Sequence, residues 1–264
     1  MSFRRTPVAL CTFLALAAGV GCGGSEDGTA AVSVATAERS TAAANTAPAA
    51  CAEGEFRRLE TALVAYGGAV RDRAVAYAGP NGRPIARFDR LNVNRVPTIF
   101  GVIGVRVDDR CRPAWYRVRL PRKPNGVMGW VRAEDVEVLP VRTRIVVDLS
   151  DRRVTLYRSG RRVLTTRAAI GSSATPTPTG SYYVNQRLVP ADPTGPFGPG
   201  AIGISAFSEV LTGWTQGGPI AIHGTNRPDL IGQAVSNGCI RVRNDVLRRL
   251  FAAAISGTPV LVRA

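Results

Sequence analysis

The chain has 264 residues, 45% of them hydrophobic, so it is long enough to bury a core and is not a disordered polymer. Its formal net charge is +15, and Lys123 is the only lysine, so arginine carries almost all of the positive charge. The arginines are dispersed, and no recognition helix or aromatic-interleaved basic stripe accompanies them, which argues against nucleic acid as a partner. One histidine and scattered acidic residues cannot build a metal site, so we expect neither a metal nor another cofactor.

The positive charge leaves two interpretations open. One is an arginine-rich proteome in which the charge has no specific purpose. The other is attraction to anionic polymers of the cell wall and to lipid headgroups, because a strongly basic surface attracts anionic partners. The start of the sequence favours the second interpretation.

The N-terminus has the pattern of a secretory signal. Arg4 and Arg5 precede an apolar run over residues 8–20, which is shorter than the about 20 residues of a membrane span. We therefore expect a signal peptide over residues 1–22 and a mature protein in the cell envelope, outside the cytoplasmic membrane or in the periplasm. Cys22 resembles the processing site of a lipoprotein, which leaves two alternatives, a lipid anchor at Cys22 or cleavage and release.

Three cysteines follow the signal region, namely Cys51, Cys111 and Cys239. An odd number is informative in an oxidising compartment, where cysteines tend to pair. The economical arrangement is a structural disulfide between Cys51 and Cys111, with Cys239 free for chemistry. Residues 23–54 are mostly rich in Ala, Thr, Ser and Gly, and they predict a flexible linker.

Residues 55–139 predict a small β domain with a helical segment at its start. Large apolar residues such as Phe56, Leu59 and Leu63 recur at helical spacing within residues 55–78. Four short β-like runs follow, separated by Pro, Gly and Asn: residues 85–88, 97–107, 115–120 and 128–131. Short strands at such spacing indicate a small barrel.

Residues 141–264 predict a mainly β domain with a helix packed against it. The β-rich runs are residues 144–149, 154–157, 163–170, 181–185, 219–222 and 258–262. Tight polar turns join the first three runs, which predicts an antiparallel meander. Asn244 is a good N-cap for a helix with one apolar face that ends before Gly257. The proline-rich residues 189–200 form a long loop of the kind that borders active sites.

Two segments near the C-terminus carry the chemistry. His223 follows the apolar run 219–222 and is predicted to lie at the end of a buried strand, and Cys239 begins another short apolar run. A thiol is a nucleophile only as a thiolate, and a neighbouring imidazole can accept its proton. Gly238 leaves room for a substrate carbonyl beside backbone amides that can serve as an oxyanion hole. Taken separately, each of the two side chains is more often a structural residue than a reactive one.

Taken together, His223-Gly224-Thr225 and the run from Ser236 to Val242 resemble the signature of the L,D-transpeptidase (YkuD-like) catalytic domain, in which His-Gly precedes Ser-His-Gly-Cys. The resemblance extends over residues 141–264 and implies an L,D-transpeptidase-type β-sandwich or mixed sheet. Three further segments belong to it: Thr177-Pro178-Thr179-Gly180, Phe197-Gly198-Pro199 and Asn244-Asp245. The run Trp115 to Leu120 with Gly129-Trp130-Val131 resembles the bacterial Src-homology-3-like barrel, as a ligand-binding module or as a structural spacer.

The resemblance implies a role for each residue of the motif. Cys239 is the nucleophile, His223 is the base, and the carbonyl of Gly224 orients the imidazole. Asn237 departs from the family, which commonly has a second histidine at this place, so we expect it to position substrate or to donate hydrogen bonds. Substrate binding is also expected of Ser236, Gly238 and Arg241. Arg241 suits a substrate carboxylate through a bidentate pair.

The implied function is that of a peptidoglycan L,D-transpeptidase, an acyltransferase of cell-wall biogenesis and cell shape that cross-links stem peptides through a cysteine acyl-enzyme. The resemblance also implies that a carbapenem acylates the nucleophile, and no cofactor is required. Two alternatives stay open. The same acyl-enzyme can be released by water, which makes an L,D-carboxypeptidase, or the chain can be a non-catalytic module that binds the cell wall.

Overall fold

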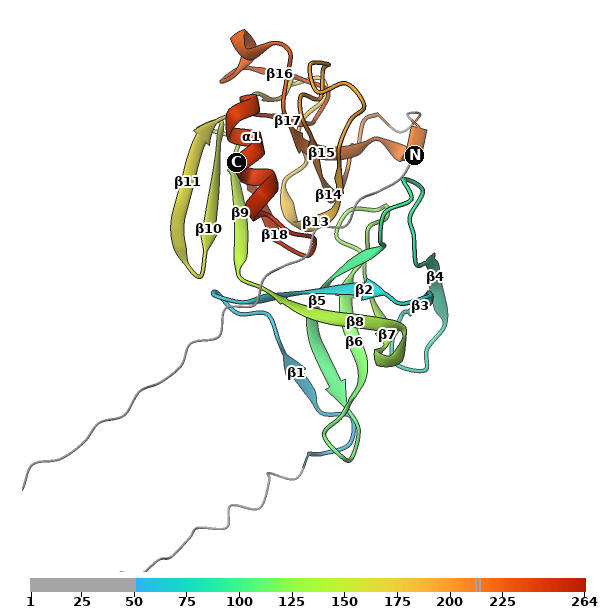
Figure 1. Ribbon diagram of the computed structural model, residues 1–264. Coiled ribbons are helices and arrows are strands. Elements are labelled where there is room, and N and C mark those ends of the chain that lie inside the picture. Colours follow the sequence, from blue (N-terminus) through green and yellow to red (C-terminus); the bar gives the residue numbers. More distant parts are fainter. Residues whose placement is uncertain (1–50, 212, 214) are drawn as a thin grey trace, which may run out of the picture. The chain divides into compact units, whose positions relative to one another are not determined.

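The computed structural model describes residues 51–264 except 212 and 214 (Figure 1). The expected signal peptide, Cys22 and the linker as far as residue 50 lie outside the described residues. Among the residues that are described, no helix combines the length and the apolar character needed to cross a membrane.

The first sheet is built from the N-terminal half of the described residues. Its strands are β1 (Phe56–Arg58), β2 (Ala65–Val70), β3 (Arg73–Tyr77), β4 (Pro84–Asp89), β5 (Ile99–Val107), β6 (Pro113–Arg119), β7 (Met128–Arg132) and β8 (Val136–Val141), with a short 3-10 helix η1 (Ala133–Asp135) before β8. Their order is β4-β3-β7-β6-β5-β2-β8, and β1 pairs with β5. Phe100, Val118 and Val131 are fully buried in its core. The short strands expected here are present, and the Src-homology-3-like assignment stays a prediction.

The helix predicted within residues 55–78 is wrong. The segment forms strands β1, β2 and β3 instead, and β2 pairs with β5 on one side and with β8 on the other. Gly67 and Gly68 in the centre of β2 disfavour a helix, because glycine loses more backbone entropy on entering a helix than other residues do. A Cβ atom on Gly67 would lie 3.1 Å from Cα of Gly257, so the close approach of two backbones decides the conformation here.

The second sheet contains eight strands from the C-terminal part of the described chain. They are β9 (Thr143–Asp148), β10 (Arg153–Arg158), β11 (Arg161–Arg167), β13 (Gly180–Leu188), β14 (Ala201–Phe207), β15 (Pro219–His223), β17 (Ile240–Arg241) and β18 (Pro259–Arg263), and two short strands, β12 (Ile170–Gly171) and β16 (Ala234–Ser236), pair separately. The order is β11-β10-β9-β18-β13-β14-β15-β17, with parallel pairing of β18 with β9 and of β15 with β17. The predicted antiparallel meander is β9-β10-β11.

One α-helix, α1 (Asn244–Ala253), packs against the second sheet in the described part of the chain (Figure 1). Leu247 and Leu250 on its apolar face are fully buried in the same core as Ile145 and Val260. Burying such side chains contributes about 1.5–3 kcal/mol each, so packing on the sheet holds this short helix. The expected fold class, mainly β with a mixed sheet and a packed C-terminal helix, is confirmed.

The predicted role of Asn244 as the helix N-cap is wrong. The helix begins at Asn244 itself, and the residue before it, Arg243, makes no side-chain capping bond. The Asn244 side chain is used elsewhere, because its Oδ1 accepts a hydrogen bond from the backbone N–H of Thr225 at 2.8 Å. A tertiary contact has therefore replaced the local capping bond that the sequence favoured.

The two sheets contact each other through β5 and β13. Tyr183 of β13 is fully buried, and its hydroxyl donates a hydrogen bond to the carbonyl oxygen of Ile99 at 3.0 Å. Gly101 of β5 lies beneath the tyrosine ring, since a Cβ atom there would be 2.7 Å from Cδ1 of Tyr183. Only glycine permits this approach. Burial raises the pKa of Tyr183 well above its ordinary value, so the hydroxyl stays protonated and remains a donor.

The predicted disulfide is present. Cys51 and Cys111 are bonded, their Cα atoms are 5.3 Å apart, and they are separated by 60 positions in the chain. Cys239 is the free cysteine among the described residues. The bridge ties the segment before β1 to the β5–β6 turn.

Removing this disulfide should lower the free energy of unfolding by about 2–4 kcal/mol, because a bridge over a loop of this length restricts the unfolded chain. The measurement is denaturant unfolding of a Cys51→Ser, Cys111→Ser double variant beside the unaltered protein, each with and without a reductant. We expect the reductant to destabilise the unaltered protein and to leave the double variant unchanged. Equal midpoints in all four samples would contradict a stabilising bridge.

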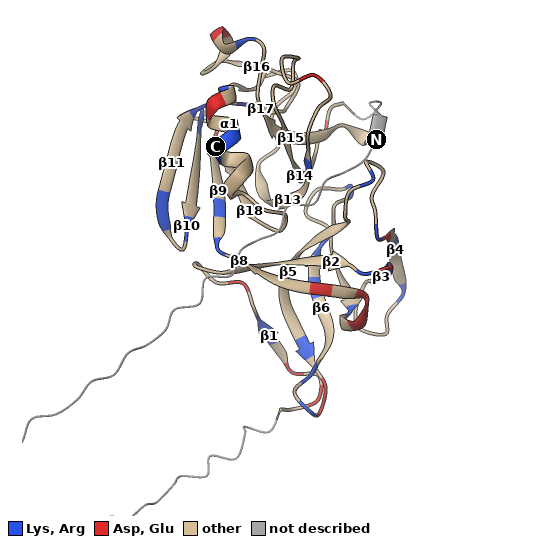
Figure 2. Cartoon of the chain, in the orientation of Figure 1, with Lys and Arg blue, Asp and Glu red and all other residues tan. Residues whose placement is uncertain are grey.

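Basic residues lie on strands of both sheets and on α1 (Figure 2). Strands β10 and β11 carry five arginines, all of them exposed: Arg153, Arg158, Arg161, Arg162 and Arg167. Most ion pairs of the described residues are solvent-exposed, as in Arg227–Asp229, and such pairs contribute about 0–1 kcal/mol each. The charge is therefore spread over the surface, as the sequence indicated.

Candidate active site

The parallel pairing of β15 with β17 brings the two chemical segments together. In this pair Ile222 lies opposite Ile240 and His223 lies opposite Arg241. Cys239, the residue before β17, is therefore level with Ala221 of β15. A pocket of about 120 Å³ opens here. Four of the predicted site residues line it, namely His223, Asn237, Cys239 and Arg241.

His223 is held in one tautomer by its neighbour. The imidazole is buried, with 3% of its surface exposed, and Nδ1 lies 2.6 Å from the carbonyl oxygen of Gly224. A carbonyl oxygen can only accept a hydrogen bond, so the proton is on Nδ1 and the lone pair of Nε2 is free. This is the contact that the sequence predicted for Gly224, and it leaves Nε2 as a base.

The environment of His223 keeps the ring neutral. The pKa of His223 is lowered to about 4, chiefly by burial; the Gly224 hydrogen bond opposes this shift, and the positive charge of Arg241 contributes to it. The imidazole is consequently unprotonated at neutral pH. A ring in this state can accept a proton but does not itself offer a positive charge.

The thiol of Cys239 is also neutral at rest. Burial raises the pKa of Cys239, while a hydrogen bond from the backbone of Ala221 and the charge of Arg241 act in the opposite direction. A protonated sulfur therefore faces the same pocket as an unprotonated imidazole. Transfer of one proton from the first to the second creates a thiolate–imidazolium pair, in which the two charges stabilise each other.

Two hydroxyl groups fix the backbone around Cys239. Ser236 Oγ donates to the carbonyl oxygen of Cys239 at 2.5 Å, and it accepts the N–H of Gly238 at 3.2 Å. Thr177 Oγ1 donates to the carbonyl oxygen of Gly238 at 2.8 Å and accepts the N–H of Gly171. The motif residue Thr177 thus holds the loop before Cys239 from a distant part of the chain.

Two expectations about substrate contacts change with this arrangement. Ser236 is buried, with 1% of its surface exposed, and neither Ser236 nor Gly238 lines the pocket. We therefore assign Ser236 a positioning role in place of substrate binding. Gly238 has a φ of 104°, and a Cβ there would lie 2.9 Å from the side chain of Ile220, so a glycine is required to turn the chain toward Cys239.

Residues outside the two predicted segments hold the turn that follows His223. The ring of Phe197 packs against the imidazole of His223, with centroids 4.9 Å apart. A Cβ atom on Gly198 or on Gly224 would lie 2.3 Å from Oδ1 of Asn244. Three segments of the chain therefore pack tightly around this turn. The motif fragments Phe197-Gly198-Pro199 and Asn244-Asp245 were visible in the sequence, but nothing in their spacing indicated these contacts.

Arg241 and Asn237 lie at the pocket with different exposure. Asn237 is exposed, and Arg241 is half-buried. Nε of Arg241 is buried and has no hydrogen-bond partner among the described residues. A buried guanidinium donor without a partner costs free energy.

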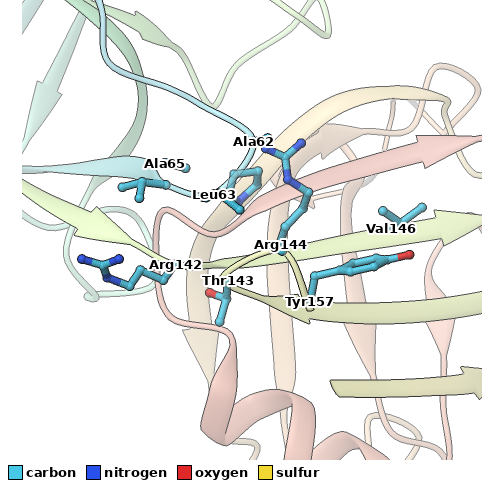
Figure 3. Close-up of a pocket in the computed structure, with 11 residues that line it drawn as sticks. Ala62, Leu63, Ala65, Arg142, Thr143, Arg144, Val146 and Tyr157 are labelled. Atoms are coloured by element: carbon cyan, nitrogen blue, oxygen red, sulfur yellow. The ribbon is translucent and has the colours of Figure 1, made fainter. Parts of the chain in front are cut away.

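A larger cavity, of about 330 Å³, lies elsewhere on the chain (Figure 3). It is lined by the segment Ala62–Ala65 and by side chains that include Arg142, Arg144 and Tyr157. No predicted site residue and neither a histidine nor a cysteine lines it. Within residues 51–264, setting aside 212 and 214, no group of three or more His, Cys, Asp or Glu side chains could hold a metal ion.

Comparison with known proteins bears on the same part of the chain. Residues 142–262 match the family of L,D-transpeptidase catalytic domains, YkuD. This range contains the pocket, both chemical segments and α1. It begins one residue after the end of β8, so the first sheet lies outside the match.

Two curated relatives carry the same family name. YkuD of Bacillus licheniformis, described as an L,D-transpeptidase, is 38% identical over 119 residues, which are 45% of this chain and 64% of that protein. YkuD of Bacillus subtilis is 36% identical over 118 residues, again 45% of this chain and 64% of the relative. The chain therefore covers less than two thirds of the length of either relative. A crystal structure of an Enterococcus faecium L,D-transpeptidase is 28% identical, with 46% of this chain and 49% of that chain covered and a TM-score of 0.36.

Proposed function

We propose that this protein is a peptidoglycan L,D-transpeptidase that acts through a thioester on Cys239. The observation that carries the proposal is the joint presence of His223 and Cys239 in one pocket, with Nδ1 of the imidazole bonded to a carbonyl and Nε2 free. The similarity of residues 142–262 to the L,D-transpeptidase family supports it and supplies the substrate class, the stem peptides of peptidoglycan.

The first half of the reaction forms the acyl-enzyme. Nε2 of His223 takes the proton from the thiol of Cys239, and the sulfur attacks the carbonyl carbon of the third residue of a donor tetrapeptide stem. The oxyanion is stabilised by backbone N–H groups, and we assign the Cys239 N–H to this role because that of Gly238 is already bonded to Ser236. The C–N bond to the terminal D-alanine then breaks, and His223 returns its proton to the leaving amine.

The second half transfers the acyl group. An amine of an acceptor stem loses a proton to His223 and attacks the thioester carbonyl, and the C–S bond breaks. Cys239 leaves as thiolate and regains a proton from the imidazolium. The product is a cross-link between the third residues of two stems. Water in place of the amine would give the carboxypeptidase reaction through the same steps.

Arg241 and Asn237 are proposed to hold the substrate. The unpartnered Nε of Arg241 supports a carboxylate ligand, such as the terminal carboxylate of the stem or that of its third residue, diaminopimelate. The carbonyl and N–H groups of Asn237 suit a peptide amide at the exposed side of the pocket. A carboxylate that pairs with Arg241 also reduces the repulsion between its guanidinium and the His223 imidazolium that forms during the reaction.

The parts of the chain before residue 142 complete the proposal. We propose that residues 55–139 form a Src-homology-3-like module ahead of a catalytic domain over residues 141–264. Residues 1–22 are proposed to export the protein to the cell envelope, with Cys22 as the candidate lipid attachment site and residues 23–54 as a linker. Mass spectrometry of the mature N-terminus from cell envelopes distinguishes a lipidated Cys22 from a cleaved and released chain.

The decisive experiment combines a covalent probe with product analysis. The unaltered protein is incubated with a carbapenem and digested, and the adduct is located by mass spectrometry. We expect one adduct, on Cys239. Incubation with disaccharide-tetrapeptide muropeptides should then give dimers linked between third residues, whereas disaccharide-tripeptides alone would mean carboxypeptidase activity. A folded, reduced protein that gives neither an adduct nor any change in muropeptides would overturn the enzymatic proposal in favour of a wall-binding module.

Asn244 should matter for the rate although it does not line the pocket. An Asn244→Ala variant loses the hydrogen bond to Thr225, which releases the turn that carries His223. We expect the acylation rate with a carbapenem to fall about 10–100-fold, because small misplacements of a base have costs of this size. The free energy of unfolding should fall by only about 1 kcal/mol. Rates are followed by the loss of carbapenem absorbance.

The matched control is Asp245→Ala, the next residue on the same helix. Asp245 is exposed and forms a loose surface pair with Arg243, with an N–O distance of 3.5 Å. We expect its acylation rate to stay within about twofold of the unaltered protein, since exposed pairs contribute little. Equal rates for the two variants would contradict a positioning role for Asn244.

A further inference from the structure

A second groove, of about 370 Å³, lies next to the candidate active site. One side comes from the β4–β5 connection of the first sheet, with Asn92 and Asn94, and the other side comes from β13, with Asn185 and Gln186. Gln216, from the segment just before β15, lines it as well. Five carboxamide side chains from three separate segments therefore meet in one place, in a chain whose surface is otherwise dominated by arginine.

The carboxamides are connected to one another. Nδ2 of Asn92 and Nδ2 of Asn94 both donate to Oε1 of Gln186, at 3.1 and 2.9 Å. Nε2 of Gln216 donates to Oδ1 of Asn94 at 3.1 Å. Oδ1 of Asn185 is buried and has no partner among the described residues. Each carboxamide offers two N–H donors and one carbonyl acceptor, which is more than the network itself consumes.

The remaining lining of the groove is mainly apolar, although it also includes Thr98 and two exposed charged residues, Arg87 and Asp89. Phe88 and Phe207 contribute rings, and Leu91 and Val93 lie on its rim with 42% and 78% of their surfaces exposed. The five carboxamides and the apolar faces together match a ligand that is rich in hydroxyl and amide groups and apolar on the faces of its rings. N-acetylated sugars have these properties, whereas stem peptides carry charged carboxylates and amines.

The distance from the nucleophile also fits. Pro219 lines both this groove and the pocket of Cys239. The parallel register of β15 with β17 places Cys239 level with Ala221, two residues from Pro219, which corresponds to about 7 Å along the strand. A donor stem attacked at its third residue has three residues between the reacting carbonyl and the glycan. Three extended residues span at most about 10–11 Å. A stem that reaches from Cys239 toward Pro219 therefore brings its glycan to the groove.

We propose that this groove binds the glycan strand of the donor, through hydrogen bonds from the carboxamides to the hydroxyl and acetamide groups of its N-acetylated sugars. The inference rests on the proposed function for its choice of substrate. The first sheet then has a direct part in substrate binding, because the β4–β5 connection supplies Asn92 and Asn94. Binding at this groove orients the donor so that the third carbonyl of its stem enters the pocket.

The test uses a sugar without any peptide, the β-1,4-linked tetramer of N-acetylglucosamine, and the full chain with a Cys239→Ala substitution. Binding is measured by titration calorimetry and by the shifts of side-chain NH₂ signals in nuclear magnetic resonance spectra. We expect binding, with shifted carboxamide signals from Asn94 and Gln216. Asn94→Leu and Gln216→Leu should each weaken binding about fivefold or more, as the loss of one hydrogen bond predicts.

The control variant is Gln233→Leu, because Gln233 is an exposed carboxamide outside the groove. We expect it to bind the tetramer as the parent does. The proposal is overturned if the parent does not bind the tetramer at millimolar concentration, or if the three leucine variants bind it equally. It is also overturned if the groove variants weaken binding of a sugar-free tetrapeptide and not of the tetramer. None of these results depends on Cys239, so the proposed function is judged separately by its carbapenem adduct.

Discussion

A Cys239→Ser variant should form no carbapenem adduct and should cross-link stem peptides at least about 10⁴-fold more slowly than the unaltered protein. Serine has nearly the size of cysteine, but its hydroxyl does not ionise near neutral pH, and a neutral imidazole in a buried pocket is a weak base for it. Cys51 and Cys111 are joined to each other and cannot substitute as nucleophiles. Adduct formation is measured by mass spectrometry and turnover by chromatography of muropeptides.

The fold of the variant is checked by its unfolding midpoint, which should stay close to that of the unaltered protein because the substitution removes little volume. A Cys239→Ala variant serves as the matched control without any hydroxyl. If either variant kept more than a tenth of the cross-linking rate, the assignment of Cys239 as nucleophile would be wrong.

A His223→Gln variant should acylate about 10³-fold more slowly at pH 7 and should show a different dependence on pH. The pKa of His223 is lowered to about 4, so the base is competent throughout pH 5–8, and the rate of the unaltered protein should be flat there and fall below about pH 4. Without the imidazole, the thiolate forms only by loss of its proton to solvent. Because burial raises the pKa of Cys239, the rate of the variant should rise about tenfold per pH unit up to pH 8.

The measurement is stopped-flow acylation by a carbapenem after a jump from neutral pH. The jump is needed because the depressed pKa also affects stability. The unfolded histidine takes up a proton below about pH 6.5 and the folded one only below about 4, so the free energy of unfolding falls by about 3 kcal/mol across this range. Parallel pH profiles for the variant and the unaltered protein would contradict a role of His223 as the base.

Local patterns were sufficient to predict most of the strands in the second sheet. The runs that became β9, β10, β13, β15 and β18 alternate or are continuously apolar, and turn residues bound them, so the local signal and the tertiary structure agree. The helix over Asn244–Ala253 was equally visible from its apolar face. Strand β14 was not predicted, because four of its seven residues are Gly, Ala or Ser and the preceding run of prolines and glycines is typical of a loop.

The errors arise where distant contacts override local preference. Spacing at Phe56 and Leu59 suggested a helix, but Phe56 packs edge-on against Trp130 of β7 and the segment pairs with β5. At Asn244 the local capping bond competes with a bond to Thr225, and the second one is formed. Neither partner can be identified from the neighbouring sequence.

The candidate site could be predicted only in part, because some of its residues carry a local motif and others come from distant parts of the chain. His223 and Cys239 carry a recognisable motif, and the parallel pairing of β15 and β17 places them at one pocket. The supports of the site come from other parts of the chain: Thr177 behind the loop of Gly238, and Phe197 beside the imidazole. The groove of carboxamides joins three segments and has no sequence pattern, so only the folded chain reveals it.

The protonated resting state of Cys239 should protect its sulfur from oxidation. Peroxides and other oxidants react with thiolates far faster than with thiols, and oxidation beyond the sulfenic acid is not readily reversed. With burial holding the proton on sulfur, and with a neutral imidazole in the same pocket, the resting protein presents little thiolate to such reagents. Inactivation by hydrogen peroxide should therefore be slow in the free protein, and a substrate that draws the proton onto His223 exposes the sulfur only for as long as the reaction lasts.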